Sequence, residues 1–97
     1  MISSDVITRM RNQAGQLRRQ FAIQNLAVFG SVARGEACAD SDVDVLVSFD
    51  GTADFDRFMG LKLHLEDLLG VSVDLVTPQA LRPELRSRIE GEAIRVA

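Results

Sequence analysis

The sequence predicts a small α/β domain, in which a β-sheet is flanked by helices that precede, connect and follow its strands. Three short segments with strand-like apolar patterns end at glycine or proline, at residues 26–29, 43–49 and 71–77. Around and between them, apolar residues recur every three or four positions, as they do in amphipathic helices. Since 97 residues provide one modest core, we expect residues 1–97 to form a single domain.

The N-terminal part contains one helical segment and one strand. Apolar residues at intervals of three and four predict a continuous helix over residues 4–21, with one buried stripe: Val6, Met10, Ala14, Leu17 and Phe21. The apolar run 26–29 is too short for a helix and ends at Gly30, so it predicts a buried strand.

The middle of the chain has the pattern of a strand, a helix and a second strand. Alternation over residues 43–49 places valines on one face and Asp44 on the other. Apolar residues at helical spacing, from Phe55 to Leu69, predict a helix that ends at Gly70. Because such a unit connects parallel strands, we expect residues 43–49 and 71–77 to pair in parallel. After Pro83, a last helix and a short strand over residues 93–96 are predicted.

Composition excludes several classes of protein. The chain carries 14 acidic and 11 basic residues, and this net charge of −3 argues against direct nucleic-acid binding. It has neither an apolar run long enough to span a bilayer nor a secretory signal, so we expect a cytoplasmic protein without membrane contact. The single Cys38 and the single His64 cannot form an internal disulfide or a structural zinc site.

The stretch from Gly30 to Asp44 carries the chemistry, although three familiar motifs fail there. A P-loop is excluded because Glu36-Ala37 stand where Lys and Ser or Thr are required. A calcium-binding EF-hand is excluded because Val45 stands where its loop needs Gly. A dinucleotide fingerprint lacks its third glycine.

A Gly-Ser turn, followed after ten residues by Asp42-Val43-Asp44, remains. Alternation sets the two carboxylates on one side of a strand, about 7 Å apart at their Cα atoms. The expected parallel pairing brings Asp74 beside them. Three clustered carboxylates repel one another unless cations neutralise them, and hard oxygen ligands at an open site favour Mg²⁺. The sequence therefore predicts a magnesium site for phosphoryl or nucleotidyl transfer.

Each of these residues also has a plainer reading. The aspartates could belong to a solvated loop, and Ser31 could cap a helical turn instead of contacting phosphate. Arg34 could bind a triphosphate or pair with a carboxylate of Glu36 or Asp40, and both alternatives stay open. We expect Asp40 to lie outside the metal site.

Gly30-Ser31, the ten-residue gap, Asp42-Val43-Asp44 and the later Val-Asp-Leu-Val around Asp74 together resemble the minimal nucleotidyltransferases of the polymerase-β-like superfamily. The resemblance spans residues 26–77. It implies a mixed sheet, ATP as the nucleotide donor, two Mg²⁺ ions on Asp42 and Asp44, and Asp74 as third ligand and candidate general base. Apart from the resemblance, Gly30 leaves room for an anion beside the backbone, Ser31 offers an N–H and a hydroxyl to phosphate oxygens, and Arg34 is a candidate to bind the triphosphate.

Free-standing members of this superfamily with this size are typically antitoxins encoded beside a HEPN-type ribonuclease toxin, in type VII-like toxin–antitoxin systems. They transfer AMP from ATP to a tyrosine of the toxin, and the same function is implied here. One alternative is a subunit that modifies a small-molecule alcohol held by a helical partner. The other is an antitoxin that binds nucleotide without turnover and neutralises its toxin by occlusion.

Overall fold

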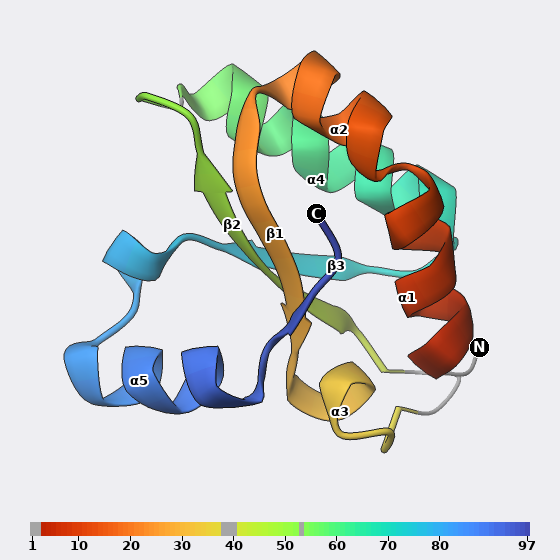
Figure 1. The fold of residues 1–97 in the computed structure, drawn as a ribbon, viewed down its shortest axis with the longest axis vertical. Coiled ribbons are helices and arrows are strands. Elements are labelled where there is room, and N and C mark those ends of the chain that lie inside the picture. Colours follow the sequence, from red (N-terminus) through yellow and green to blue (C-terminus); the bar gives the residue numbers. More distant parts are fainter. Residues whose placement is uncertain (1–2, 38–40, 53) are drawn as a thin grey trace.

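A computed structural model describes residues 3–37, 41–52 and 54–97. Its centre is a four-stranded sheet in the order β3-β2-β1-β4 (Figure 1). The strands are β1 (Ile23–Phe29), β2 (Val43–Phe49), β3 (Val73–Val76) and β4 (Ile94–Arg95). β2 and β3 pair in parallel, whereas β1 is antiparallel to both β2 and β4. The parallel pairing predicted from the crossover pattern and the mixed sheet implied by the resemblance are both confirmed.

The strands are positioned by the alternation seen in the sequence. Val43, Val45 and Val47 are buried on one face of β2, and they pack with the apolar residues of β1 and β3. The last two strands are shorter than expected, because Val71 and Ser72 precede β3 and Val96 follows β4. Beyond β4 the chain still runs beside β1, where the backbone groups of Leu26 hydrogen-bond to those of Val96 and Ala97.

The prediction of one continuous helix over residues 4–21 is wrong, because this segment forms two helices. These are α1 (Ser3–Asn12) and α2 (Ala14–Phe21), and Gln13 between them has φ −99° and ψ 0°. The N–H of Gln13 bonds to the carbonyl of Met10, which is a tighter turn than an α-helix makes. Gly15, a weak helix former, lies two residues after Gln13. The predicted apolar stripe is still buried, because both helices pack their apolar residues into the same core.

The central helix α4 (Phe55–Leu69) supplies the other side of the core. Asp54 caps it, because its side chain accepts a hydrogen bond from the Arg57 N–H at 2.7 Å. Its buried positions are Leu61, Leu65 and Leu69. Phe55 shares the helical spacing of these residues, but as the first residue of the helix it is 75% exposed.

The last helix α5 (Pro83–Glu92) begins at Pro83 as predicted, after a short 3₁₀ turn η1 (Pro78–Ala80). In Figure 1, α1, α2 and α4 lie together, whereas α5 lies apart from them, towards α3 (Gly30–Ala33). All ten residues of α5 are described and none is buried. One face of the sheet therefore carries the core. The other face, which bears Asp44, Leu46 and Ser48 and adjoins α5, is called the α5 face below.

Within the described ranges, no helix is both long and apolar enough to cross a bilayer.

We expect Gly70→Ala to lower the free energy of unfolding by about 1 kcal/mol. Gly70 ends α4 at φ +72° with open space around it, so the substitution strains the backbone without a clash. Gly91→Ala in α5 is the matched control, because Gly91 also has open space but an ordinary helical backbone. It should stabilise the fold by up to about 1 kcal/mol. Urea unfolding measures both, and equal effects of the two substitutions would contradict the assignment.

Candidate active site

The sheet register brings the predicted carboxylates together. Asp44 is the direct partner of Asp74 in the parallel β2–β3 pair, and of Phe29 in the antiparallel β1–β2 pair. Asp42 lies two residues before Asp44, just ahead of β2. Asp44 is half-buried, while Asp42 and Asp74 are exposed. The three acids therefore lie at one end of the sheet, on the α5 face, beside the point where β1 ends.

Gly30 follows β1 directly, and its backbone touches this carboxylate group. Its φ is +69°, a conformation that favours glycine. A Cβ atom at this position would lie 2.2 Å from Oδ2 of Asp44, far inside van der Waals contact. A side chain at this position would therefore strain the backbone and push the Asp44 carboxylate aside.

The turn after Gly30 is the four-residue helix α3. Val32 anchors it in the core with 2% exposure, and Ser31 beside it is half-buried. The carbonyl of Ser31 accepts the Glu36 N–H at 2.8 Å, which closes the turn. Ser31 thus lies next to the carboxylates, where the sequence placed it, on a turn that the core holds in place.

Arg34, which the sequence left with two readings, forms ion pairs in this structure. Its Nε lies 3.1 Å from Oε2 of Glu36, and its Nη1 lies 3.1 Å from Oε2 of Glu92. The pairing with Glu36 is confirmed, while Asp40 and Cys38 lie outside the described residues. Half of the Arg34 side chain remains exposed, so a ligand can still reach it.

Glu92, at the end of α5, is the residue of this site that the sequence did not reveal. One of its oxygens accepts the Gly30 N–H at 3.0 Å, in addition to the ion pair with Arg34. The Gly30 N–H and then Arg34 hold the pKa of Glu92 below its ordinary value, so it is ionised at neutral pH. No local pattern links two residues that are 62 positions apart, and the acidic residue at the end of the last helix was the only signal.

The carboxylates repel one another through space. Burial raises the pKa of Asp44, and the charges of Asp74 and Asp42 raise it further. Arg34 acts in the opposite direction, because its positive charge favours the ionised form of Asp44. A cation bound among the three acids would relieve this repulsion.

The donor set fits Mg²⁺, although the side chains do not form a closed cage. Across residues 3–37, 41–52 and 54–97, no three Asp, Glu, His or Cys side chains converge closely enough to hold a metal ion by themselves. Mg²⁺ normally takes one or two protein carboxylates and completes its shell with water and substrate phosphates. Neighbouring, accessible carboxylates of this kind meet that requirement, and substrate oxygens would complete the shell.

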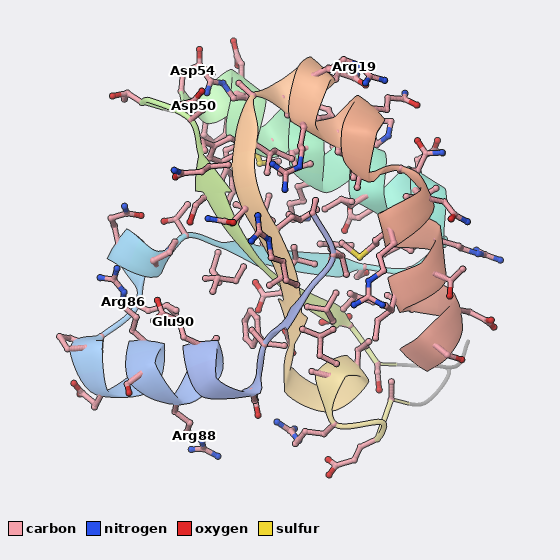
Figure 2. All side chains as sticks on the ribbon, in the orientation of Figure 1. Arg19, Asp50, Asp54, Arg86, Arg88 and Glu90 are labelled. Carbon is pink, nitrogen blue, oxygen red and sulfur yellow. The ribbon has the colours of Figure 1, made fainter. Side chains whose placement is uncertain are left out.

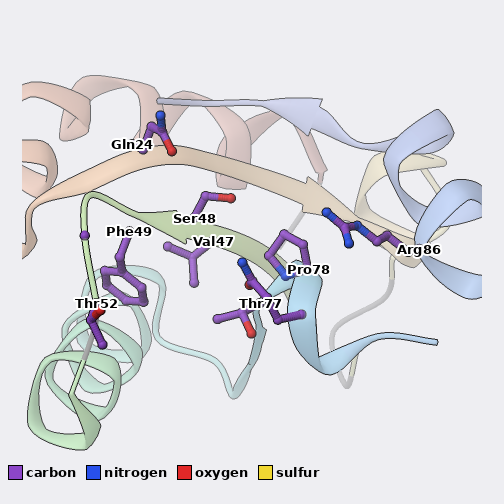
Figure 3. A pocket seen from close by; sticks show the side chains of 10 residues that line it. Gln24, Val47, Ser48, Phe49, Thr52, Thr77, Pro78 and Arg86 are labelled. Atoms are coloured by element: carbon purple, nitrogen blue, oxygen red, sulfur yellow. The ribbon is translucent and has the colours of Figure 1, made fainter. Parts of the chain in front are cut away.

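A separate pocket of about 460 Å³ lies at the opposite ends of β2 and β3, and the three aspartates are not among its lining residues (Figure 3). Ser48, Thr77 and Arg86 line it with further polar groups. Ser48 and Asp44 lie on the same face of β2, about 13 Å apart along the strand.

Comparisons with known proteins agree with this geometry. The family profile described as "Nucleotidyltransferase domain" matches residues 10–96. A protein of Methanocaldococcus jannaschii whose name assigns it to the protein adenylyltransferases is 37% identical, over 96% of each chain. The protein adenylyltransferase MntA of Thermococcus cleftensis is 41% identical, over 84% of this chain and 82% of that protein.

Solved structures share the fold. A structure named as a minimal nucleotidyltransferase superposes with a TM-score of 0.84 and 42% identity, over 97% of this chain and 95% of that chain. A chain of a toxin–antitoxin complex with AMP-PNP has a TM-score of 0.74 and 25% identity, over 90% of this chain and 72% of that chain. The complex of tri-AMPylated Shewanella oneidensis HEPN toxin with its MNT antitoxin, at 22% identity and a TM-score of 0.67, shows the shared fold alone.

Gly30→Ala should weaken the binding of Mn²⁺, used as a probe for Mg²⁺, by about tenfold or more, because the new Cβ displaces the Asp44 carboxylate. Gly35→Ala is the matched control. Gly35 has a nearly equal φ of +73° but open space around it, so it adds the same backbone strain without touching the acids. Electron paramagnetic resonance of free Mn²⁺ measures both affinities. Equal affinities for the two variants would show that the close approach of Gly30 is irrelevant to cation binding.

Asp44→Asn should stabilise the fold at pH 7. The raised pKa of Asp44 means that the folded chain binds its proton more tightly than the unfolded chain does. The ionised carboxylate therefore lowers stability above its folded-state pKa, and this penalty disappears as the pH falls to its ordinary value of 3.8. Melting temperatures at decreasing pH should show the advantage of the variant shrinking.

The exposed Asp67→Asn on α4 is the control for the loss of one negative charge. An Asp44→Asn chain that is no more stable than this control at pH 7 would contradict the penalty that burial and the neighbouring acids place on the ionised Asp44.

Proposed function

The chain belongs to the nucleotidyltransferase domain family, and on this premise we propose that it transfers AMP from ATP to a protein as the antitoxin of a toxin–antitoxin pair. The observation that carries the proposal is the register that pairs Asp44 with Asp74 and sets Gly30 against Asp44. That arrangement joins a turn suited to phosphate with carboxylates suited to cations. We place the reaction in the cytoplasm, as the sequence suggests, and in one minimal domain.

The residues receive the following roles. Asp42, Asp44 and Asp74 would hold two Mg²⁺ ions, which supply charge neutralisation for the triphosphate and its departing pyrophosphate. The N–H and hydroxyl of Ser31 receive phosphate oxygens on the turn after β1, and Gly30, which has no Cβ atom, lets the phosphate approach the backbone closely. Arg34 adds a positive charge beside the same turn.

The transfer itself exchanges one phosphorus–oxygen bond for another. The hydroxyl oxygen of the acceptor forms a bond to the α-phosphorus of ATP, and the bond from that phosphorus to the bridging oxygen of pyrophosphate breaks. Asp74, on the outer strand of the three that meet here, takes the proton of the hydroxyl as general base. The products are the AMP-modified acceptor and pyrophosphate.

The acceptor is proposed to be a tyrosine of a HEPN-type toxin encoded nearby. Two relatives at 37% and 41% identity carry names as protein adenylyltransferases, which supports a protein as the acceptor. The toxin–antitoxin complex with AMP-PNP, at 25% identity, supports a toxin as the partner and a nucleotide as the donor. This chain contains no tyrosine, so a tyrosine acceptor has to come from another protein.

Incubation with the neighbouring toxin, Mg²⁺ and α-labelled ATP should label the toxin, and mass spectrometry should find the added AMP on tyrosine. The double variant Asp42→Asn with Asp44→Asn should reduce labelling by about a hundredfold or more, because the cations lose their ligands. Asp67→Asn is the matched control and should leave labelling unchanged.

The alternatives give different results in the same experiment. A toxin without added AMP, together with a labelled small alcohol, would assign the chain to small-molecule modification. Full protection of cells by the double variant would favour neutralisation by occlusion.

A further inference from the structure

Glu92 connects the last helix to the candidate nucleotide site through two different donors. Its Oε1 accepts the backbone N–H of Gly30 at 3.0 Å, and its Oε2 lies 3.1 Å from Nη1 of Arg34. The Glu92 side chain is only 26% exposed, compared with 49% for Glu90 on the same helix. Glu92 therefore lies between α5 and the turn, while Glu90 belongs to the surface.

The Gly30 N–H needs this acceptor. Gly30 is the first residue of α3, where backbone N–H groups have no partner inside the helix. Its neighbour Phe29 provides no side-chain cap. The carboxylate of Glu92 supplies the missing partner from the other end of the chain, and so it fixes the turn at the position where Gly30 meets Asp44.

The Glu92 carboxylate also restricts the orientation of the Arg34 side chain. A free arginine side chain samples many rotamers, and the loss of this freedom opposes ligand binding. Glu92 and Glu36 hold the guanidinium from two sides, although Glu36 is itself 63% exposed. The less exposed Glu92 is the more effective anchor, and it places the Arg34 charge close enough to act on Asp44.

We propose that Glu92 is a positioning residue for the nucleotide, which holds the Gly30 turn and the Arg34 guanidinium where they receive the phosphate groups. This inference rests on the proposed function. It also gives α5 a task that its packing does not explain, since none of its ten described residues is buried. The C-terminal helix delivers one carboxylate to the nucleotide site.

The test compares Glu92→Ala, Glu92→Gln and the control Glu90→Ala in the transfer reaction with the neighbouring toxin. Glu92→Ala should raise the KM for ATP about tenfold with a smaller change in kcat, because binding geometry is lost and the carboxylates remain. Glu92→Gln should recover part of the loss, since its amide oxygen still accepts the Gly30 N–H. Glu90→Ala removes an exposed pair with Arg86 on the same helix (Figure 2) and should leave KM unchanged.

A double-mutant cycle with Arg34→Ala separates positioning from simple support of the helix. If Glu92 acts through Arg34, the fold-increase in KM for the double variant is well below the product of the fold-increases for the two single variants. Independent, multiplying effects would overturn the proposal, and so would a Glu92→Ala chain with the KM of the control. Should Glu92→Ala fail to fold, the Glu92→Gln comparison and its cycle decide. A wild-type chain that transfers no AMP would overturn the proposed function itself and this inference with it.

Discussion

The close approach of Gly30 to the Asp44 carboxylate is the constraint on which the site depends. It requires β1 to end at Phe29, the register to place Phe29 opposite Asp44, and the next residue to lack a Cβ atom. The parallel pairing of β2 with β3 then adds Asp74 at the same level. A slip of β2 by one residue would turn Asp44 to the valine face, and a slip of β3 by one residue would turn Asp74 away from Asp44, so either slip would separate the carboxylates. The alternation of β2 that buries its valines in the core therefore also places Asp44 on the opposite face, at the site.

One face of the sheet carries the hydrophobic core, and the other face carries the candidate active site. Helices α1, α2 and α4 cover one face with buried apolar residues, so the main stabilising core lies away from the site. The α5 face carries charge instead, and burial together with mutual repulsion raises the pKa of Asp44 at its centre. A cluster of like charges weakens a fold unless a ligand compensates it. Because the core lies on the other side of the sheet, the chain can tolerate this local repulsion.

Local patterns predicted the strands, the central helix and the clustering of the aspartates, because periodicity and turn residues act over a few positions. They failed where distant contacts decide. The break at Gln13 lies within an apolar stripe that continues across it, and Phe55 has helical spacing but begins the helix on its outer side. Glu92 could not be assigned, since its role arises only when the end of the chain folds back beside the end of β1. For Arg34, the sequence predicted either a carboxylate or a phosphate as its partner. Only the folded structure shows that its carboxylate partners are Glu36 and Glu92.

The exposure of the site bears on how a partner would contribute. Asp42 and Asp74 are exposed and no closed metal cage exists within the described residues, so the chain alone leaves the reaction open to water. Transfer to a hydroxyl competes with hydrolysis unless water is excluded. Under the proposed function, the acceptor protein brings both the hydroxyl and the surface that covers it. On that proposal, transfer depends on the bound partner both for its acceptor and for its protection from hydrolysis.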